Sequence, residues 1–475
     1  MNRQNFLGHL ALALMLVLVA AFVGQVRRWE SRRPAPTGVF KQRRVGPPPG
    51  TTPTTAGRRE PEVLVRFRDG VSPERVRALT AGRNDQVEDE VEAVANLYSV
   101  DDRDDADAEL VAAEYSSLPE VLYAEPNGRV EVGPLPSFSL YRELITGVEG
   151  GPNDPLFPQQ WALVNKGQRE GKDDADISAV AAWAKTRGSD EVVVAVLDSG
   201  VDYSHPDLVE NMWVRPDHLD PYFDDELGAF DDFNGYSAVA ASRDPMDENG
   251  HGTHVAGIVG ARGNNGLGVT GVNWNVRIMP LKFMGRGGFG TTKDAIEAIN
   301  YAVGRRKAGV NVRVINASWG SRTKSKALED AIAAAGREGI LFVAASGNDG
   351  ADADRRPHYP SSYDLPNVLS VAAMNRRDEL ASFSNYGARS VHLAAPGAEI
   401  LSTWLGDSFE EHSGTSMATP VVAGVAALVL SVEPDLGVKE LRSRLLETSD
   451  RLDVLKGKVS SGGRVNAARA VGASR

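Results

Sequence analysis

The sequence contains no cysteine among its 475 residues. This absence excludes disulfide bonds, metal sites built from thiolates and catalysis by a cysteine nucleophile. Extra stabilisation of the fold must therefore come from packing or from metal ions held by oxygen ligands. With 42% hydrophobic residues, the chain can bury at least one large core, and its length allows two or three domains.

Acidic residues are nearly absent from the first 60 positions. This segment carries ten Lys and Arg against two acidic residues, Glu30 and Glu60, which leaves a local charge of +8. Because the whole chain has a net charge of −12, the other 415 residues together carry −20. An acidic body repels nucleic acid, so we expect no nucleic-acid partner.

A long apolar run lies near the N-terminus, at residues 6–26, with arginines on both sides. Its length approaches the ~20 residues that span a bilayer, so residues 1–26 are predicted to be a signal peptide or a membrane anchor. Either would export the protein, secreted or anchored, with its body outside the cytoplasm. The arginines that follow the run oppose this orientation, because positive flanks favour the cytoplasmic side. A buried core helix is the alternative.

Composition divides the rest of the chain into two linkers and two folded parts. Residues 27–60 are rich in Pro, Gly, Thr and Arg, which is typical of a disordered linker. Residues 61–132 alternate strand-like and helix-like patterns and predict a small α+β domain. A second Pro- and Gly-rich connector, 133–152, separates it from residues 153–475. In the small domain we expect strands at 62–68, 94–100 and 121–132, and helices at 73–79 and 106–117.

Residues 153–475 predict one large α/β domain. Uninterrupted apolar runs alternate there with helical stretches, at residues 192–197, 276–281, 312–315, 340–345 and 368–372. Such runs are typical of strands buried on both faces of a parallel sheet. We therefore expect a mostly parallel sheet flanked by helices.

An aspartate and a histidine lie at positions where a parallel sheet places reactive groups. Asp198 comes directly after the run 192–197, so its carboxylate is expected at the carboxyl end of a core strand. A structural Asp that caps the next turn is the alternative. His251 opens a helix of small residues, from which its imidazole can project into a cleft as a general base. The spacing to His254 would also suit a metal pair, but no acidic residue on the same helical face supports one.

A serine and an asparagine lie at comparable positions, the serine before a predicted helix and the asparagine after a predicted strand. Ser416 precedes an apolar helix, where its backbone N–H is free to donate and the helix dipole favours negative charge. Pro420 is expected in the first turn of that helix, where no intrahelical N–H is needed. Asn348 follows another core strand. Its amide could donate, together with the Ser416 N–H, to a negatively charged oxygen formed during a reaction. Taken singly, Ser416 would be an N-cap and Asn348 a turn residue.

Together these segments resemble the subtilisin-like serine proteases, the subtilase or peptidase S8 family. The shared motifs are VVVAVLDSGVD around the Asp, HGTHVAG around the His, GTSMATP around the Ser and AASGN before the Asn, in the family's order. The resemblance covers roughly residues 153–472. It implies a serine endopeptidase that hydrolyses peptide bonds in proteins through an acyl-enzyme.

The resemblance also assigns a role to each residue. Ser416 would attack the peptide carbonyl, and His251 would remove and later return its proton. Asp198 would hold the imidazole and stabilise its charged form. The side chain of Asn348 and the backbone N–H of Ser416 would form the oxyanion hole.

A peptide-binding cleft is implied in the same way. Two segments would clamp an extended peptide as a β-strand between them. They are Ser318, Trp319 and Gly320 on one side and Gly288, Phe289 and Gly290 on the other. Phe289 would line a pocket for a residue upstream of the cut. Asp349 would favour a basic substrate residue at the pocket rim, or be an exposed turn carboxylate.

Calcium is the cofactor that the resemblance implies, and no organic cofactor is expected. Asp154, Asp207 and Asn265 match positions of the family's tight Ca²⁺ site. Oxygen ligands from distant segments suit Ca²⁺ and could replace the missing disulfides, whereas surface turn residues are the alternative. An acidic insert at residues 224–235 lacks the strict order of a second calcium loop and predicts a solvated loop.

The 61–132 domain resembles the ferredoxin-like inhibitory propeptides of the family. It would cover the cleft as an intramolecular inhibitor and assist folding, and the connector 133–152 would be the site of autocleavage. The chain would thus be an autoprocessed zymogen. The alternative is an inactive or self-cleaving-only subtilase fold that acts as a binding protein. No reacting residue is missing, although His412 and Val421 depart from the usual residues near the cleft.

Overall fold

The computed structural model describes residues 63–104, 106–133, 137–138, 148–224, 228–239 and 243–473. The predicted N-terminal segment 1–26 and the linker 27–60 lie outside these residues. We call residues 63–133 the N-terminal unit and residues 148–473 the large domain.

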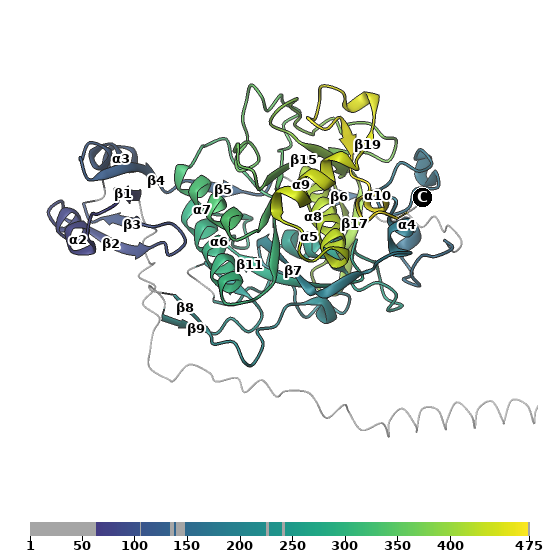
Figure 1. Ribbon diagram of the computed structural model, residues 1–475, viewed down its shortest axis with the longest axis horizontal. Helices are drawn as coiled ribbons and strands as arrows, with labels where there is room; N and C mark the ends of the chain where they lie inside the picture. The colour runs from purple at the N-terminus through teal and green to yellow at the C-terminus, as the bar shows by residue number, and fades with distance from the viewer. Residues whose placement is uncertain are drawn as a thin grey trace, which may run out of the picture. The chain divides into compact units, whose positions relative to one another are not determined.

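The N-terminal unit contains a four-stranded antiparallel sheet with the order β2-β3-β1-β4 (Figure 1). Its elements are β1 (Val63–Phe67), α2 (Pro73–Ala81), β2 (Asp85–Glu90), β3 (Leu97–Asp102), α3 (Ala108–Ser116) and β4 (Val121–Pro126). The sequence prediction missed β2, because the segment DQVEDE has little apolar content and gains its strand geometry by pairing with β3. The single strand predicted for 121–132 is wrong, since β4 ends at Pro126 and β5 (Arg129–Glu131) is separate.

The large domain is built on a nine-stranded sheet, which confirms the predicted α/β class. Neighbouring strands run parallel, except that β19 and β20 are antiparallel at one edge. The order along the sheet is β10 (Tyr236–Ser237), β11 (Asn275–Lys282), β7 (Gly188–Asp198), β13 (Val312–Ala317), β14 (Leu341–Ala345), β15 (Val368–Met374), β16 (Leu393–Pro396), β20 (Gly463–Arg464) and β19 (Asp450–Arg451).

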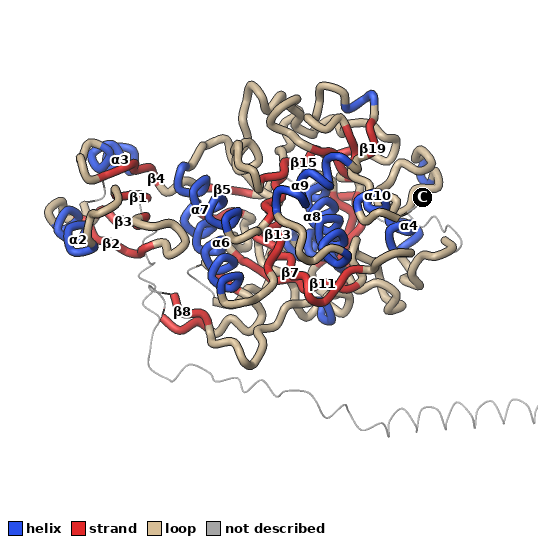
Figure 2. Tube along the Cα trace, in the orientation of Figure 1, coloured by secondary structure: helices blue, strands red, loops and turns tan. Residues whose placement is uncertain are grey.

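Helices cover both faces of this sheet (Figure 2). On one face, Val194 and Val196 of β7 belong to the core formed with α5 (His251–Gly260) and α8 (Thr415–Val432). On the other face, Val193 and Leu197 belong to the core with α6 (Thr292–Lys307) and α7 (Lys326–Arg337). The apolar runs are therefore continuous because alternate residues enter different cores.

Shorter elements complete the described fold. They are α4 (Ala179–Trp183), α9 (Val438–Glu447), α10 (Ala467–Ala470), β6 (Ser137–Phe138), β8 (Tyr222–Asp224), β9 (Gly228–Phe230), β12 (Phe289–Thr291), β17 (Ile400–Trp404), β18 (Ser408–His412) and the 3₁₀ turns Phe157–Gln159, Gln168–Glu170, Val209–Asn211 and Asp453–Leu455. Among the described residues, α8 alone is long and apolar enough to cross a membrane, and it is buried in the core.

The N-terminal unit docks onto the exposed starts of α6 and α7. Glu125 accepts hydrogen bonds from the backbone N–H groups of Lys326 (2.8 Å) and Ala327 (3.1 Å) in the first turn of α7. Asn127 Oδ1 accepts from the N–H of Lys293 (3.0 Å) in the first turn of α6. Because the first N–H groups of a helix lack intrahelical partners, these contacts satisfy donors that the large domain leaves open.

The acidic insert is not the solvated loop that its composition predicts. Asp232 is fully buried, with ion pairs to Arg215 (3.0 Å) and Arg305 (2.5 Å) and a hydrogen bond from Tyr301 Oη (2.7 Å). Buried charges require such partners, and here they come from α6 and from the segment before the insert. Asp232 is therefore packed against α6, whereas the neighbouring Asp231 is 88% exposed.

Candidate active site

The polar residues that follow three neighbouring strands converge on one edge of the sheet. Asp198 is the last residue of β7, Ser318 directly follows β13, and Asn348 follows β14. Strands β7, β13 and β14 are adjacent and parallel, so their carboxyl ends share an edge. This edge is where parallel sheets place their sites.

Asp198 and His251 form a buried hydrogen-bonded pair. His251 Nδ1 lies 2.6 Å from Asp198 Oδ1, and neither side chain is exposed. The N–H of Ser199 also donates to this oxygen, at 2.8 Å, which fixes the carboxylate. His251 Nε2 has no hydrogen-bond partner within the described residues. The imidazole is therefore held through one nitrogen while the other stays available as a base.

Glycines allow α5 to approach the strand so closely. A Cβ atom on Gly252 would lie 2.0 Å from the carbonyl oxygen of Gly200 and 3.2 Å from Asp198 Cβ. Any larger residue at position 252 would push His251 away from Asp198. His254 Nε2 bonds to the carbonyl oxygen of Glu410 (3.0 Å), and the described residues contain no group of three or more His, Cys, Asp or Glu side chains that could hold a metal ion.

Ser416 is the second residue of α8, and Pro420 lies inside this helix rather than in its first turn as predicted. Because proline has no N–H, the Ser416 carbonyl lacks its helical donor. Ser318 Oγ donates to that carbonyl at 2.8 Å, and Ser416 Oγ donates to the Ser318 carbonyl at 2.8 Å. The proline thus frees a carbonyl that ties the serine to the end of β13.

Asn348 presents its amide N–H₂ group to the cleft. Its Oδ1 accepts hydrogen bonds from the N–H (2.8 Å) and the Oγ1 (2.9 Å) of Thr415. These two donors identify the oxygen and direct Nδ2 away from α8. A Cβ atom built on Gly133 would lie 3.0 Å from this Nδ2, so the N-terminal unit ends beside it.

The two predicted walls of the cleft hold a strand of the same chain. Strand β5 pairs antiparallel with β12, with Glu131 opposite Phe289 and Val130 opposite Gly290. On the other side, Glu131 forms an antiparallel bridge to Gly320, and the N–H of Val132 donates to the Gly288 carbonyl at 3.0 Å.

The side chains of the walls differ in exposure. Phe289 is 46% exposed and stacks under the guanidinium of Arg129, whose carbon lies 3.9 Å from the ring centre. Trp319 is buried, and its indole donates to the Leu197 carbonyl at 2.9 Å. This hydrogen bond links the segment 318–320 to β7.

A cavity of about 480 Å³ opens beside Ser416, bounded by Gly320, Gly347 and Asn348. Two of its residues, Arg322 and His358, were missed by sequence reasoning, because no motif surrounds them and only folding brings them to the cleft. Asp349 is exposed, as the turn alternative predicted, and it forms an ion pair with Arg322, whose Nη2 lies 3.0 Å from its Oδ1.

The predicted calcium residues lie together around the turn at 264–268. Both oxygens of Asp154 accept backbone N–H groups, from Asn264 (2.8 Å) and Asn265 (3.1 Å). Asn265 Nδ2 donates to Asp207 Oδ1 at 2.8 Å. Burial, and next the nearby Asp154, raise the pKa of Asp207 to about 6. Oxygen atoms of this kind suit a cation, although N–H groups donate to both oxygens of Asp154, to both oxygens of Asp207 and to the amide oxygen of Asn265.

Comparison with known proteins assigns the family. The sequence model of the subtilase family matches residues 189–472. The thermophilic serine proteinase of Bacillus sp. (strain AK1) is 34% identical over 413 residues, which are 86% of this chain and 87% of that protein. This chain belongs to the subtilase family. It is therefore a subtilisin-like serine endopeptidase with protein substrates, as the motifs predicted.

Other subtilases match a shorter part of this chain. The halolysin-like extracellular serine protease Nep of Natrialba magadii is 36% identical over 302 residues, 63% of this chain and 49% of that protein. Subtilisin-like protease 2 of Plasmodium falciparum is 37% identical over 292 residues, 60% of this chain and 21% of that protein. The present chain spans about half the length of the Natrialba magadii protease and about a fifth of the length of the Plasmodium falciparum protease.

Replacing Asn348 by alanine is expected to lower kcat while KM changes little, because its amide would act on the oxyanion formed in the transition state. Loss of the equivalent donor in subtilisin costs roughly 10²–10³ in kcat, and that scale is carried over from subtilisin itself. Steady-state hydrolysis of a peptide substrate measures both constants. Asn375→Ala, in the turn after β15, is the matched control, and an equal loss in that variant would contradict the role of Asn348.

Proposed function

We propose that the buried Asp198–His251 pair, with Ser416 and Asn348, carries out peptide hydrolysis through an acyl-enzyme. The observation that supports this most directly is the 2.6 Å contact between His251 Nδ1 and Asp198 Oδ1 beside a cleft that holds an extended strand. The contact orients the imidazole so that Nε2 can act as a base on the serine.

The reaction follows from these positions. Ser416 Oγ leaves its hydrogen bond to the Ser318 carbonyl and attacks the substrate carbonyl while His251 takes its proton. The negative charge on the carbonyl oxygen is stabilised by the amide of Asn348 and the backbone N–H of Ser416 at the start of α8. His251 then donates the proton to the leaving amine, and water releases the acyl group by the reverse sequence of proton transfers.

We also propose that the N-terminal unit is an inhibitory propeptide and that the protein is a zymogen. Strand β5 occupies the cleft as a substrate would, paired with both walls and ending at Gly133 beside Asn348. The same unit satisfies the first N–H groups of α6 and α7, which gives it affinity for the large domain. Cleavage within residues 133–152 would separate the two parts.

Export is the third element of the proposal. The related protease from Natrialba magadii is named extracellular, and the apolar run at 6–26 has the composition of an export signal. Retention of that run as a membrane anchor is the finer alternative, which N-terminal sequencing of the mature protein would decide.

Finally, we propose that Asp207 and Asn265 contribute to a structural Ca²⁺ site. A bound Ca²⁺ would neutralise the buried carboxylate of Asp207 and link it to the turn at 264–268. The raised pKa of Asp207 supports this, because burial disfavours its negative charge despite the hydrogen bonds from Asn265 Nδ2 and the Val269 N–H.

Expression of the full chain and of Ser416→Ala tests both catalysis and processing. The parent protein is expected to react with a fluorophosphonate probe, cleave casein and lose its N-terminal unit. The Ser416→Ala variant should do none of these, because the nucleophile is absent. Labelling, casein assays and intact mass measure the outcome.

Ser460→Ala, an exposed serine outside the cleft, is the matched control and should behave as the parent. A folded parent protein that is not labelled would refute the catalytic assignment. Equal processing of the parent and the Ser416→Ala variant would remove self-cleavage. Labelling and processing without casein cleavage would favour the self-cleaving-only alternative.

Removal of calcium is expected to lower the midpoint of thermal unfolding. An ion at about 100 times its Kd stabilises the folded state by about 2.7 kcal/mol, which EDTA would remove and added Ca²⁺ restore. Asp207→Asn should abolish most of this difference, whereas Asp364→Asn, an exposed turn residue, should preserve it. The site would be refuted by equal unfolding midpoints of the parent protein in EDTA and in Ca²⁺.

A further inference from the structure

The cavity beside Ser416 has a matched pair of charges at its rim. Arg322 and Asp349 both line the cavity, and their side chains are joined by an ion pair of 3.0 Å. The two side chains are about half exposed, at 52% and 43%, so both also face solvent. An unpaired carboxylate here would attract a cationic substrate residue, and the adjacent guanidinium cancels most of that attraction.

The floor of the cavity adds no charge. His358 lies between two glycines, where a Cβ atom on Gly320 would be 2.2 Å from its Cε1 and one on Gly347 would be 2.9 Å from its Cδ2. Burial lowers the pKa of the His358 imidazole, so it is neutral at neutral pH. The other charged side chains at the cavity, Arg129 and Glu131, belong to the N-terminal unit and leave with it on processing.

We propose that Arg322 determines specificity by masking Asp349. The pocket therefore accepts uncharged residues before the cleaved bond and does not favour the basic residue that Asp349 alone would select. This inference rests on the proposed function, because it takes the cavity beside Ser416 as the pocket for that substrate residue.

Three peptides that differ only in the residue before the cleaved bond, Lys, Glu or Met, test this inference. For the parent protein we expect the highest kcat/KM with Met. Arg322→Gln should raise the Lys-to-Glu ratio of kcat/KM roughly fivefold, and Asp349→Asn should lower it by a similar factor. The double variant should return to the parent ratio, and both shifts should shrink at high salt.

A purely structural role for Arg322 would change kcat/KM for all three peptides equally. An unchanged ratio in Arg322→Gln, or a parent protein that already prefers Lys, would overturn the proposal. Peptide phosphonates with the same three side chains repeat the comparison through the labelling rate of Ser416 alone. A protein that does not turn over peptides is thereby distinguished from one that turns them over without selecting among the three side chains.

A separate observation concerns the contact between the N-terminal unit and α6. Asp89 of β2 and Glu297 of α6 are 7% and 6% exposed, and their carboxyl groups lie close enough across this interface to act on each other. Two ionised carboxylates buried side by side repel each other, so the contact favours a proton on one of them. Both come from parts of the chain that separate on processing under the proposed function.

The surroundings of this pair are mostly acidic. Glu92 of the N-terminal unit accepts a hydrogen bond from Asn300 of α6, and Lys293 Nζ lies 3.8 Å from Asp89 Oδ2. The other titratable groups that act on the pair or its neighbours are Asp224 and Tyr222 of β8, Tyr236 of β10 and Arg305 of α6.

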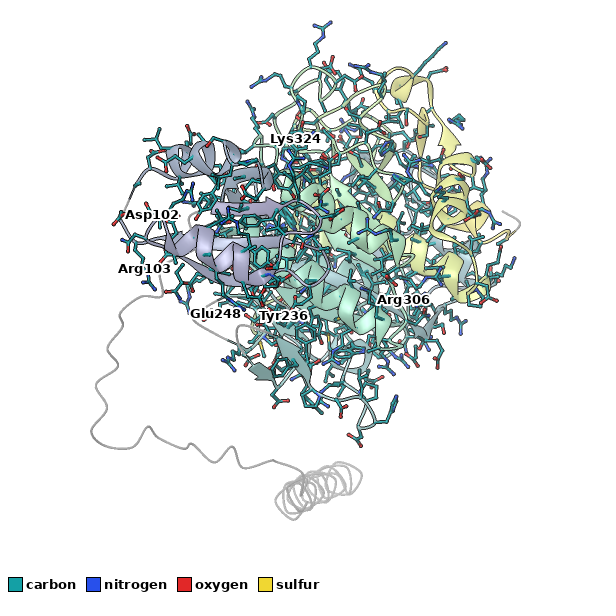
Figure 3. All side chains as sticks on the ribbon, turned by 60° about the vertical axis from the view of Figure 1, so that its left-hand side comes forward. Asp102, Arg103, Tyr236, Glu248, Arg306 and Lys324 are labelled. Carbon is teal, nitrogen blue, oxygen red and sulfur yellow. The ribbon has the colours of Figure 1, made fainter. Side chains whose placement is uncertain are left out.

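Burial is the main cause that raises the pKa of Asp89, Glu92 and Glu297, and the neighbouring carboxyl groups add to the rise for each. The acidic groups of the cluster are packed by aromatic rings. Tyr236, labelled in Figure 3, stacks on Tyr301 with ring centres 4.8 Å apart, and its Oη donates to Asp224 at 3.2 Å.

We propose that the buried carboxyl pair Asp89–Glu297 is a pH-sensitive latch on the N-terminal unit. A carboxyl group that is protonated when docked and ionised when free favours docking at acidic pH. This contribution is lost as the pH rises through the pKa of the docked state. The unit is therefore held most firmly in acid and loosens toward neutral pH.

A second contact of the interface provides an internal comparison. Asp330 of α7 pairs with Arg66 and accepts from Tyr123 Oη at 2.8 Å. Although burial opposes it, hydrogen bonds from Lys326 and Tyr123 and the charge of Arg66 lower the pKa of Asp330. Asp330 is thus ionised across the range in which the latch titrates, and its contact does not weaken toward neutral pH.

Hydrogen exchange of the full chain carrying Ser416→Ala tests the latch without self-cleavage. The amides to follow are those in the first turns of α6 and α7, which the N-terminal unit caps. Between about pH 5 and about pH 8 we expect their protection, corrected for intrinsic exchange, to fall roughly tenfold. Glu297→Gln keeps the size of the side chain and carries no charge at any pH, so it should flatten this fall at least threefold.

Two further variants act as controls. Glu440→Gln, exposed on α9, should leave the profile unchanged. Asp330→Asn should lower protection at every pH and keep the slope. An equal slope with and without Glu297→Gln, or protection that rises with pH, would overturn the latch. Because Ser416 is absent, the result is independent of whether the enzyme is active.

Discussion

The parallel pairing of β7, β13 and β14 is the constraint on which the site depends. Hydrogen bonding places Asn316 of β13 opposite Val196 of β7 and opposite Val343 of β14, so the three strands end at the same level. A shift of one residue in any strand would exchange its two buried faces, which both cores oppose. The polar residues that follow these strands are thereby held within reach of one another.

The two core helices deliver the remaining groups to this edge. Helix α5 brings His251 to Asp198 because Gly252 removes the side chain that would separate them. Helix α8 brings Ser416 to the end of β13, where Pro420 leaves the Ser416 carbonyl open for Ser318. In both cases a residue without an ordinary side chain or N–H makes a close approach possible.

The N-terminal unit uses groups that the large domain leaves unsatisfied. It caps α6 and α7 through Asn127 and Glu125, and it adds β5 to the open edge of β12. These polar contacts specify the docked position, and apolar residues of the unit, Leu64, Val91 and Leu97 among them, join the core that contains α6 and α7. The buried carboxyl groups at β2 and α6 are the exception, since they oppose docking when ionised.

Sequence by itself determined the α/β class, the family and the order of the reactive residues. Continuous apolar runs reflect burial on both faces, and the motifs around Asp198, His251 and Ser416 are local. The charged strand β2, the packed acidic insert and the position of Pro420 within α8 were not predicted, because each depends on neighbours distant in the chain. Tertiary structure alone decided that Arg322 faces Asp349 and that Asp89 meets Glu297, since such pairs form only when separate segments pack.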